Sequence, residues 1–202
     1  MNKTNRLFYI LIIGSIWGFI EATLGMVLHI IRLPFTGAIL ASVGMCFMYY
    51  GWKFDGSKMP VAIAFVAASF KVFDSLFLGI PFITPMIFNP FVSIIAEGLL
   101  FSGVAYLFLE KDKEKVLFPQ RVLFPLTISI VCFAVYLRAL IIGLRTEIYF
   151  LFPNFLIPLI LGLSFSYLID FISIDSMRKY KTKPIFAVLS YISVVIITIL
   201  CM

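Results

Sequence analysis

The first apolar stretch of the chain, residues 7–31, reads LFYILIIGSIWGFIEATLGMVLHII and follows the basic residues Lys3 and Arg6. A run of this length is sufficient for a helix that crosses the ~30 Å hydrocarbon core of a bilayer. It is longer than the apolar segment of a secretory signal peptide, and no small-residue cleavage pattern follows it cleanly. We therefore interpret residues 7–31 as a retained first membrane span.

Six more apolar runs follow, and together they predict an all-α integral membrane helical bundle. The seven expected spans are Leu7–Ile31, Phe35–Gly51, Val61–Gly79, Ile87–Leu109, Val122–Leu144, Tyr149–Ile172 and Ile185–Cys201. Every connection is shorter than about a dozen residues, so residues 1–202 are expected to form one polytopic domain. Six spans, with a cytoplasmic C-terminus, is the alternative count. A composition of 62% hydrophobic and 13% charged residues excludes an ordinary soluble domain.

Positive charge alternates across these spans. Twelve of the 16 Lys and Arg residues are expected on one side: Lys3, Arg6, Lys53, Lys58, Lys111, Lys113, Lys115, Arg121, Arg178, Lys179, Lys181 and Lys183. The opposite side holds only Arg32 and Arg145, and Lys71 and Arg138 lie inside spans. Because Lys and Arg are retained in the cytoplasm during insertion, we predict a cytoplasmic N-terminus and a multi-pass protein of the cell membrane.

Several function classes are disfavoured by the sequence. The net charge of +6 is spread over four short loops, which favours anionic lipid headgroups over nucleic acid as the partner. The three cysteines lie far apart inside predicted helices and suggest neither a disulfide framework nor a metal site. No nucleophile motif and no phosphate-binding glycine loop is present, so we expect neither an enzyme nor a resident cofactor.

Small residues form a stripe on the first predicted helix. Gly14, Gly18 and Ala22 are spaced four residues apart, with Gly25 close to the same line. Such a stripe allows another helix to approach to backbone contact. Two interpretations remain open here: packing inside this bundle, or a docking face for a separate membrane subunit.

Charged residues inside the predicted spans are the main candidates for function, because a charge in a bilayer normally faces a bundle interior or a cavity. They are Glu21, Lys71, Asp74, Glu97 and Arg138. At about 1.5 Å per residue, all five lie between the midplane and the outer surface, at depths of roughly 8–15 Å. Three acids against two bases is a near balance. Lys71 and Asp74 are three residues apart and can pair directly.

A polar residue also begins the fourth predicted span. Asn89 can cap that helix and Pro90 suits its first position. Ser93 and Glu97 follow at intervals of four residues, so they share a face with Asn89. We expect Glu21, Lys71, Asp74, Asn89, Glu97 and Arg138 to line an outward-facing pocket for a small polar molecule. The alternative is a dry salt-bridged network that only fixes helix packing.

The only histidine, His29, does not indicate a metal site. Eight residues separate it from Glu21, which is more than two helical turns, and no His pair with metal-ligand spacing exists. We expect His29 to lie near the headgroups.

This combination resembles a known family. A short all-helical chain with basic inner loops and outward-facing polar residues is similar in architecture to the S components of energy-coupling factor transporters, which capture vitamins and related micronutrients. The stripe of Gly14, Gly18 and Ala22 matches the small-residue pattern by which S components dock on a transmembrane coupling subunit. The seven predicted spans depart from the usual six, and no substrate is carried over. The resemblance implies that a coupling subunit and ATPase subunits energise the protein.

Two other classes remain as alternatives. A proton-coupled secondary transporter would use Glu21, Asp74 or Glu97 as its protonation site and would work without partners. A structural or assembly protein would use the charges for packing and the small-residue stripe for partner binding, and it would hold no small molecule.

Overall fold

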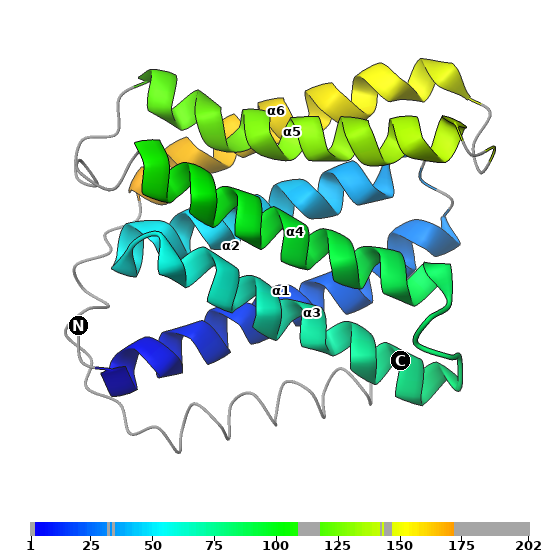
Figure 1. Cartoon of the computed structure of the whole chain (residues 1–202), viewed down its shortest axis with the longest axis horizontal. Coiled ribbons are helices and arrows are strands. Elements are labelled where there is room, and N and C mark those ends of the chain that lie inside the picture. The colour runs from blue at the N-terminus through cyan, green and yellow to red at the C-terminus, as the bar shows by residue number, and fades with distance from the viewer. Residues whose placement is uncertain are drawn as a thin grey trace.

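The chain folds as a bundle of long helices in the computed structural model, which describes residues 3–31, 33, 35–108, 118–141, 143 and 147–171 (Figure 1). The elements are α1 (Lys3–Ile30), α2 (Thr36–Asp55), α3 (Lys58–Leu78), α4 (Pro85–Phe108), α5 (Phe118–Ile141), the short 3-10 helix η1 (Ile148–Phe150) and α6 (Leu151–Phe171). Each of the first six expected spans matches one long helix to within about one turn, as is usual for helix ends. The expected span at residues 185–201 lies outside the described residues.

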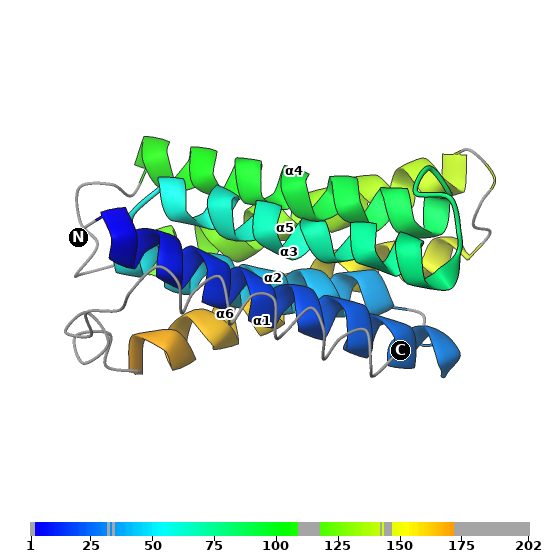
Figure 2. The same cartoon turned by 90° about the horizontal axis from the view of Figure 1, so that it is seen from below.

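Successive helices alternate in direction along the long axis of the bundle, as Figures 1 and 2 show. The beginning of α1, the end of α2 and the beginning of α3 therefore lie at one end, together with the end of α4, the beginning of α5 and the end of α6. This end carries Arg6, Lys53, Lys58 and Arg121, as the charge pattern predicts for these four. The other residues of that prediction include several outside the described residues: Arg32, Lys111, Lys113, Lys115, Arg145, Arg178, Lys179, Lys181 and Lys183. We call this end of the bundle the basic end. Its assignment to the cytoplasm stays a prediction.

Helix α2 is the centre of the bundle, because it contacts all five other long helices. It is also the least lipid-like of them. Helices α1, α3, α4, α5 and α6 are long and apolar enough to cross a membrane, whereas α2, which has three glycines and two tyrosines, is not among them. A helix surrounded by protein has no need to match lipid, and small residues let its neighbours approach closely.

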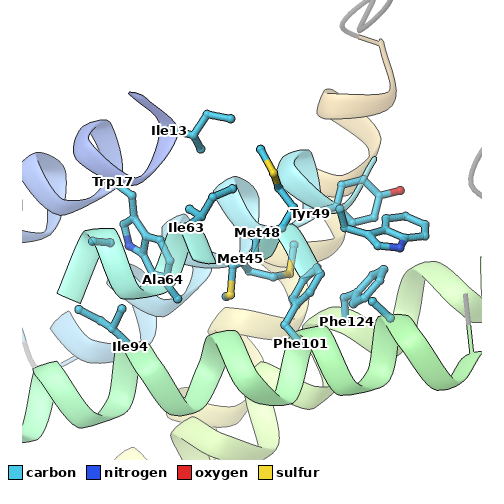
Figure 3. Close-up of a cluster of buried hydrophobic side chains, with 14 of the residues drawn as sticks. Ile13, Trp17, Met45, Met48, Tyr49, Ile63, Ala64, Ile94, Phe101 and Phe124 are labelled. Carbon is cyan, nitrogen blue, oxygen red and sulfur yellow. The ribbon is translucent and has the colours of Figure 1, made fainter. Parts of the chain in front are cut away.

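A single hydrophobic core follows α2 through the bundle (Figure 3). Met45, Met48 and Tyr49 of α2 are fully buried in it. Phe101 of α4 stacks on Phe124 of α5 with 4.1 Å between ring centroids. Dispersion between close-packed atoms, rather than exclusion of water, drives helix association inside a membrane, so such contacts are the main source of bundle stability.

The outer faces of α4, α5 and α6 are apolar. Only 28%, 22% and 17% of their membrane-crossing segments are buried inside the bundle. The exposed side chains are large and hydrophobic, among them Val92, Leu99, Leu107, Val135, Phe152 and Ile160. In water such a surface would promote association, but lipid tails solvate it.

A tight turn joins α3 to α4 at the end opposite the basic end. Helix α3 ends at Gly79, whose φ of 62° lies in the left-handed region that glycine adopts without strain. The Ser75 hydroxyl donates a hydrogen bond of 2.6 Å to the carbonyl oxygen of Ile80 and holds the turn. Phe82 then packs edge-on against Phe91 of α4, with 5.0 Å between ring centroids. The turn is thereby folded back onto the start of α4.

Candidate binding site within the bundle

Four ionisable side chains from three helices interact electrostatically inside the bundle: Glu21 of α1, Lys71 and Asp74 of α3, and Glu97 of α4. We call them the carboxylate cluster. Their carboxyl-bearing residues are only 5–7% exposed, although ionised groups are rarely buried without compensation. Counted from the ends of α1 and α3 and from the start of α4, Glu21, Lys71 and Glu97 lie about 14, 10 and 18 Å deep at 1.5 Å per residue. The cluster is therefore well inside the apolar layer.

The only ion pair in the cluster joins two neighbours on α3. Lys71 Nζ lies 3.0 Å from Asp74 Oδ2, as the spacing of three residues predicts. The other carboxylate oxygen of this residue, Asp74 Oδ1, is buried and has no hydrogen-bond partner among the described residues. Most buried polar atoms in native proteins have a hydrogen-bond partner, so a buried carboxylate oxygen without one suggests that an additional partner binds there.

Glu21 faces this pair from α1. It lies within electrostatic range of Lys71 and Asp74, and also of Glu97 on α4. Trp17, one turn earlier on α1, brings its indole close to Glu21. Its Nε1 atom is buried and has no hydrogen-bond partner among the described residues. Two buried polar atoms without hydrogen bonds, Asp74 Oδ1 and Trp17 Nε1, thus belong to or border the cluster.

Glu97 is held by its own helix. The Ser93 hydroxyl donates a hydrogen bond of 3.0 Å to Glu97 Oε1, one turn away on α4. Glu97 lies within electrostatic range of the Glu21 carboxyl and of Cys132 of α5. The sequence analysis placed neither Cys132 nor Trp17 in the site, although the spacing of four between Trp17 and Glu21 is a signal that could have found Trp17.

Two residues expected in the site lie elsewhere. Arg138 is exposed on α5, three residues before that helix ends, where a long cationic side chain can reach the headgroup region. Asn89 is exposed as well and does not cap α4, because the helix already begins at Pro85. Asn89 and Pro90 are interior residues of α4. The expected near balance of three acids to two bases is therefore three to one among the described residues.

The small-residue stripe lies against α3 of the same chain. A Cβ added at Gly14 would come within 2.6 Å of Val66 Cβ and 2.9 Å of the Ile63 carbonyl oxygen, and one added at Gly18 would collide with the Phe70 ring. Ala22 is buried in line with them. The structure thus places the stripe as a close contact between α1 and α3, which is the internal-packing interpretation. Another helix could reach this backbone only if α3 moved away.

Sequence reasoning missed a second polar group, at the basic end. Asp170 of α6 lies 3.0 Å from Lys53 Nζ of α2 and 2.6 Å from an Arg121 side-chain nitrogen of α5. The Tyr49 hydroxyl donates a longer hydrogen bond of 3.3 Å to the same carboxylate. Asp170 therefore ties three helices together. The sequence indication for this group was a single acid, Asp170, at the end of a predicted span on the side that carries many bases. Its partners could not be identified because Lys53 and Arg121 lie far from it in the sequence.

The chemistry available to the carboxylate cluster follows from its own groups. Among the described residues, no three His, Cys, Asp or Glu side chains are arranged to hold a metal ion. The cluster offers carboxyl oxygens as acceptors, one ammonium and an indole N–H as donors, and more carboxyl groups than bases. The chain matches no protein-family model, no curated protein and no solved structure.

Proposed function

We propose that this chain is a membrane transport protein that captures a small polar solute in the carboxylate cluster. Five apolar helices long enough to cross a bilayer support the membrane setting. The observation that carries the proposal is the three-to-one ratio of acids to bases in a buried cluster, together with the unpartnered Asp74 Oδ1. A network kept only for packing would be expected to balance its charges and satisfy its polar atoms, because buried charges without partners are strongly destabilising.

The solute would enter from the end opposite the basic end. The cluster lies in the half of α1 and α3 that is nearer to that end. With the basic end in the cytoplasm, this is the outer side. The solute would pass the turn that Phe82 holds against α4, so uptake would require this turn or the neighbouring helix ends to separate.

The resemblance to S components adds a prediction about energy. The chain has no phosphate-binding glycine loop, so ATP hydrolysis would come from ATPase subunits acting through a coupling subunit. Because α3 covers Gly14 and Gly18 and because Ala22 is buried, the coupling subunit would contact a different face.

A second candidate is a proton-coupled secondary transporter. The specific observation in its favour is the proximity of Glu21 and Glu97, two buried carboxyls that act on each other electrostatically. Such a pair can take up and release a proton during transport. This protein would lose activity when an uncoupler collapses the proton gradient, whereas a transporter with ATPase subunits would lose it on depletion of ATP.

Native mass spectrometry of the gently purified protein tests the proposal. We expect a small molecule to co-purify with the parent protein and to be lost from Glu97→Gln, in which a neutral amide replaces a carboxylate of nearly the same shape. Arg138→Gln is the matched control, because it removes a charge from an exposed position, and it should keep the small molecule. The proposal fails if every preparation is empty and no cluster variant changes anything except stability.

A further inference from the structure

The charge of the carboxylate cluster constrains the kind of solute that it holds. When all groups are ionised, Glu21, Asp74 and Glu97 carry three negative charges and Lys71 carries one positive charge. Arg138, the second cation expected from the sequence, is exposed and does not compensate them. A buried site does not keep such an excess of negative charge: a bound cation or bound protons must neutralise it.

The internal ion pair shows how a positive group fits. The Lys71 ammonium contacts one oxygen of Asp74 at 3.0 Å and leaves the other oxygen, Oδ1, buried and without a partner. Glu21 lies on the neighbouring helix within electrostatic range of the same pair. A second ammonium or a guanidinium would meet an unsatisfied acceptor at Asp74 and further negative charge from Glu21.

Aromatic surface borders the same place. Trp17 is 1% exposed, lies beside Glu21 and stacks on Phe47 with 6.5 Å between ring centroids. Phe70 contacts α1 at Gly18, one turn before Glu21. Carboxylates flanked by indole and phenyl rings are a favourable environment for organic cations, which gain cation–π attraction in addition to charge neutralisation.

We propose, on the basis of the proposed function, that the solute is an organic cation whose ammonium or guanidinium group binds Asp74, with Glu21 and then Glu97 contributing from the neighbouring helices. An anionic solute would add negative charge to a site that already has an excess. A neutral solute would require the carboxyl groups in excess to be neutralised by protons instead. A metal ion is disfavoured because the described residues include no group of three His, Cys, Asp or Glu ligands suited to it.

Fluorescence titration of the full chain tests the charge class directly. The chain has two tryptophans, so Trp52→Phe leaves Trp17 beside Glu21 as the only reporter. The probes are methylammonium, tetramethylammonium and guanidinium chlorides, with acetamide as the neutral probe and sodium acetate as the anionic probe, all at one ionic strength set with sodium chloride. We expect at least one organic cation to give a saturable change in Trp17 fluorescence, and acetamide and acetate to give none.

Variants then assign the response to the cluster. Glu97→Gln and Glu21→Gln should weaken the apparent affinity for the responding cation at least about tenfold, as expected for loss of a buried charge contact. Arg138→Gln should leave it unchanged. If either glutamine variant fails to fold, Glu97→Asp, which keeps the charge, takes its place. A lower affinity of this variant for the responding cation, with acetamide and acetate still giving no change, also assigns the response to the cluster.

The outcomes separate this inference from the proposed function. A response to acetamide, acetate or sodium equal to that of the cations overturns the cationic class, while solute capture stands. A co-purified molecule without a positive charge does the same. A response that follows pH alone, with no dependence on organic cations, assigns the site to protons and overturns the inference. No response to any probe, combined with an empty protein in native mass spectrometry, overturns both.

Discussion

At the scale of single residues, the ion pair of Lys71 and Asp74 is the part of the carboxylate cluster that contributes to the fold. Both side chains are about nine-tenths buried, and the 3.0 Å contact places an ammonium directly on a carboxylate. Glu21 and Glu97 have no cation of their own at such a distance among the described residues. Asp74 is therefore paired through one of its oxygens, whereas neither Glu21 nor Glu97 has a cation in contact within the described part of the chain.

The first prediction follows from this asymmetry. Lys71→Met strands the buried Asp74 carboxylate and should lower the free energy of unfolding by about 3–5 kcal/mol. The double variant Lys71→Met with Asp74→Leu removes both charges and should recover most of that loss. Chemical denaturation of the detergent-solubilised protein measures both. Equal stability of the single variant and the parent would mean that water already reaches the pair.

At the scale of elements, two kinds of contact hold the helices together. Close approach of α1 and α3 depends on glycines that face a backbone, and the joining of α2, α5 and α6 at the basic end depends on Asp170. For each contact, we predict the effect of one substitution on stability and compare it with a control substitution elsewhere in the chain.

The second prediction concerns the contact between α1 and α3. In Gly14→Ala the new methyl group would lie 2.9 Å from the Ile63 carbonyl oxygen, which belongs to the backbone and cannot rotate away. We expect a destabilisation of roughly 1–3 kcal/mol, typical of overpacking. Gly103→Ala on α4 is the control, since a Cβ there meets nothing within 4 Å. It should be neutral or slightly stabilising, because alanine favours a helix over glycine. Equal thermal unfolding of the two variants would contradict the close contact.

The third prediction concerns the basic end. Asp170→Asn leaves Lys53 and Arg121 facing each other without the carboxylate between them, and we expect a loss of about 1–3 kcal/mol. Asp55→Asn is the control: its pair with Arg6 is more exposed, with 36% of the Arg6 side chain accessible, so its removal should change stability by less than about 1 kcal/mol. If the two variants unfold at the same denaturant concentration, Asp170 does not tie the three helices together.

At the scale of the whole molecule, the bundle places apolar helices around a less apolar centre. Helix α2 lies in the middle with its aromatic and small residues, while α4, α5 and α6 turn hydrophobic faces outward. This is the distribution expected when the outer helix faces contact lipid and the central helix contacts only other helices. The carboxylate cluster and the Asp170 contacts then occupy opposite halves of one membrane-spanning body.

The fourth prediction is the orientation of this body. In a variant without the native cysteines, Ile83→Cys lies on the exposed turn between α3 and α4, and Lys58→Cys lies at the exposed start of α3. A membrane-impermeant maleimide added to intact cells should label Ile83→Cys and spare Lys58→Cys until the cells are broken. The reverse pattern would place the basic end outside and the solute entrance in the cytoplasm.

The sequence alone determined the features that depend on local spacing. Apolar run lengths located the six described long helices, and the alternation of Lys and Arg predicted that Arg6, Lys53, Lys58 and Arg121 lie at one end. The interval of three between Lys71 and Asp74 predicted their pairing. These predictions succeed because a helix turns by a constant angle per residue, so the residues that share one helix face can be identified before the fold is known.

Only the tertiary structure decided which face of each helix turns inward. Membrane helices are apolar on nearly every side, so hydrophobic pattern cannot indicate the rotation of each helix about its axis. For that reason the outward position of Arg138, the packing of Gly14 on α3, and the convergence of Lys53 and Arg121 on Asp170 were not predictable. The central position of α2 could not be predicted from the sequence either. Hydropathy measures affinity for lipid, and α2 packs almost entirely against other helices.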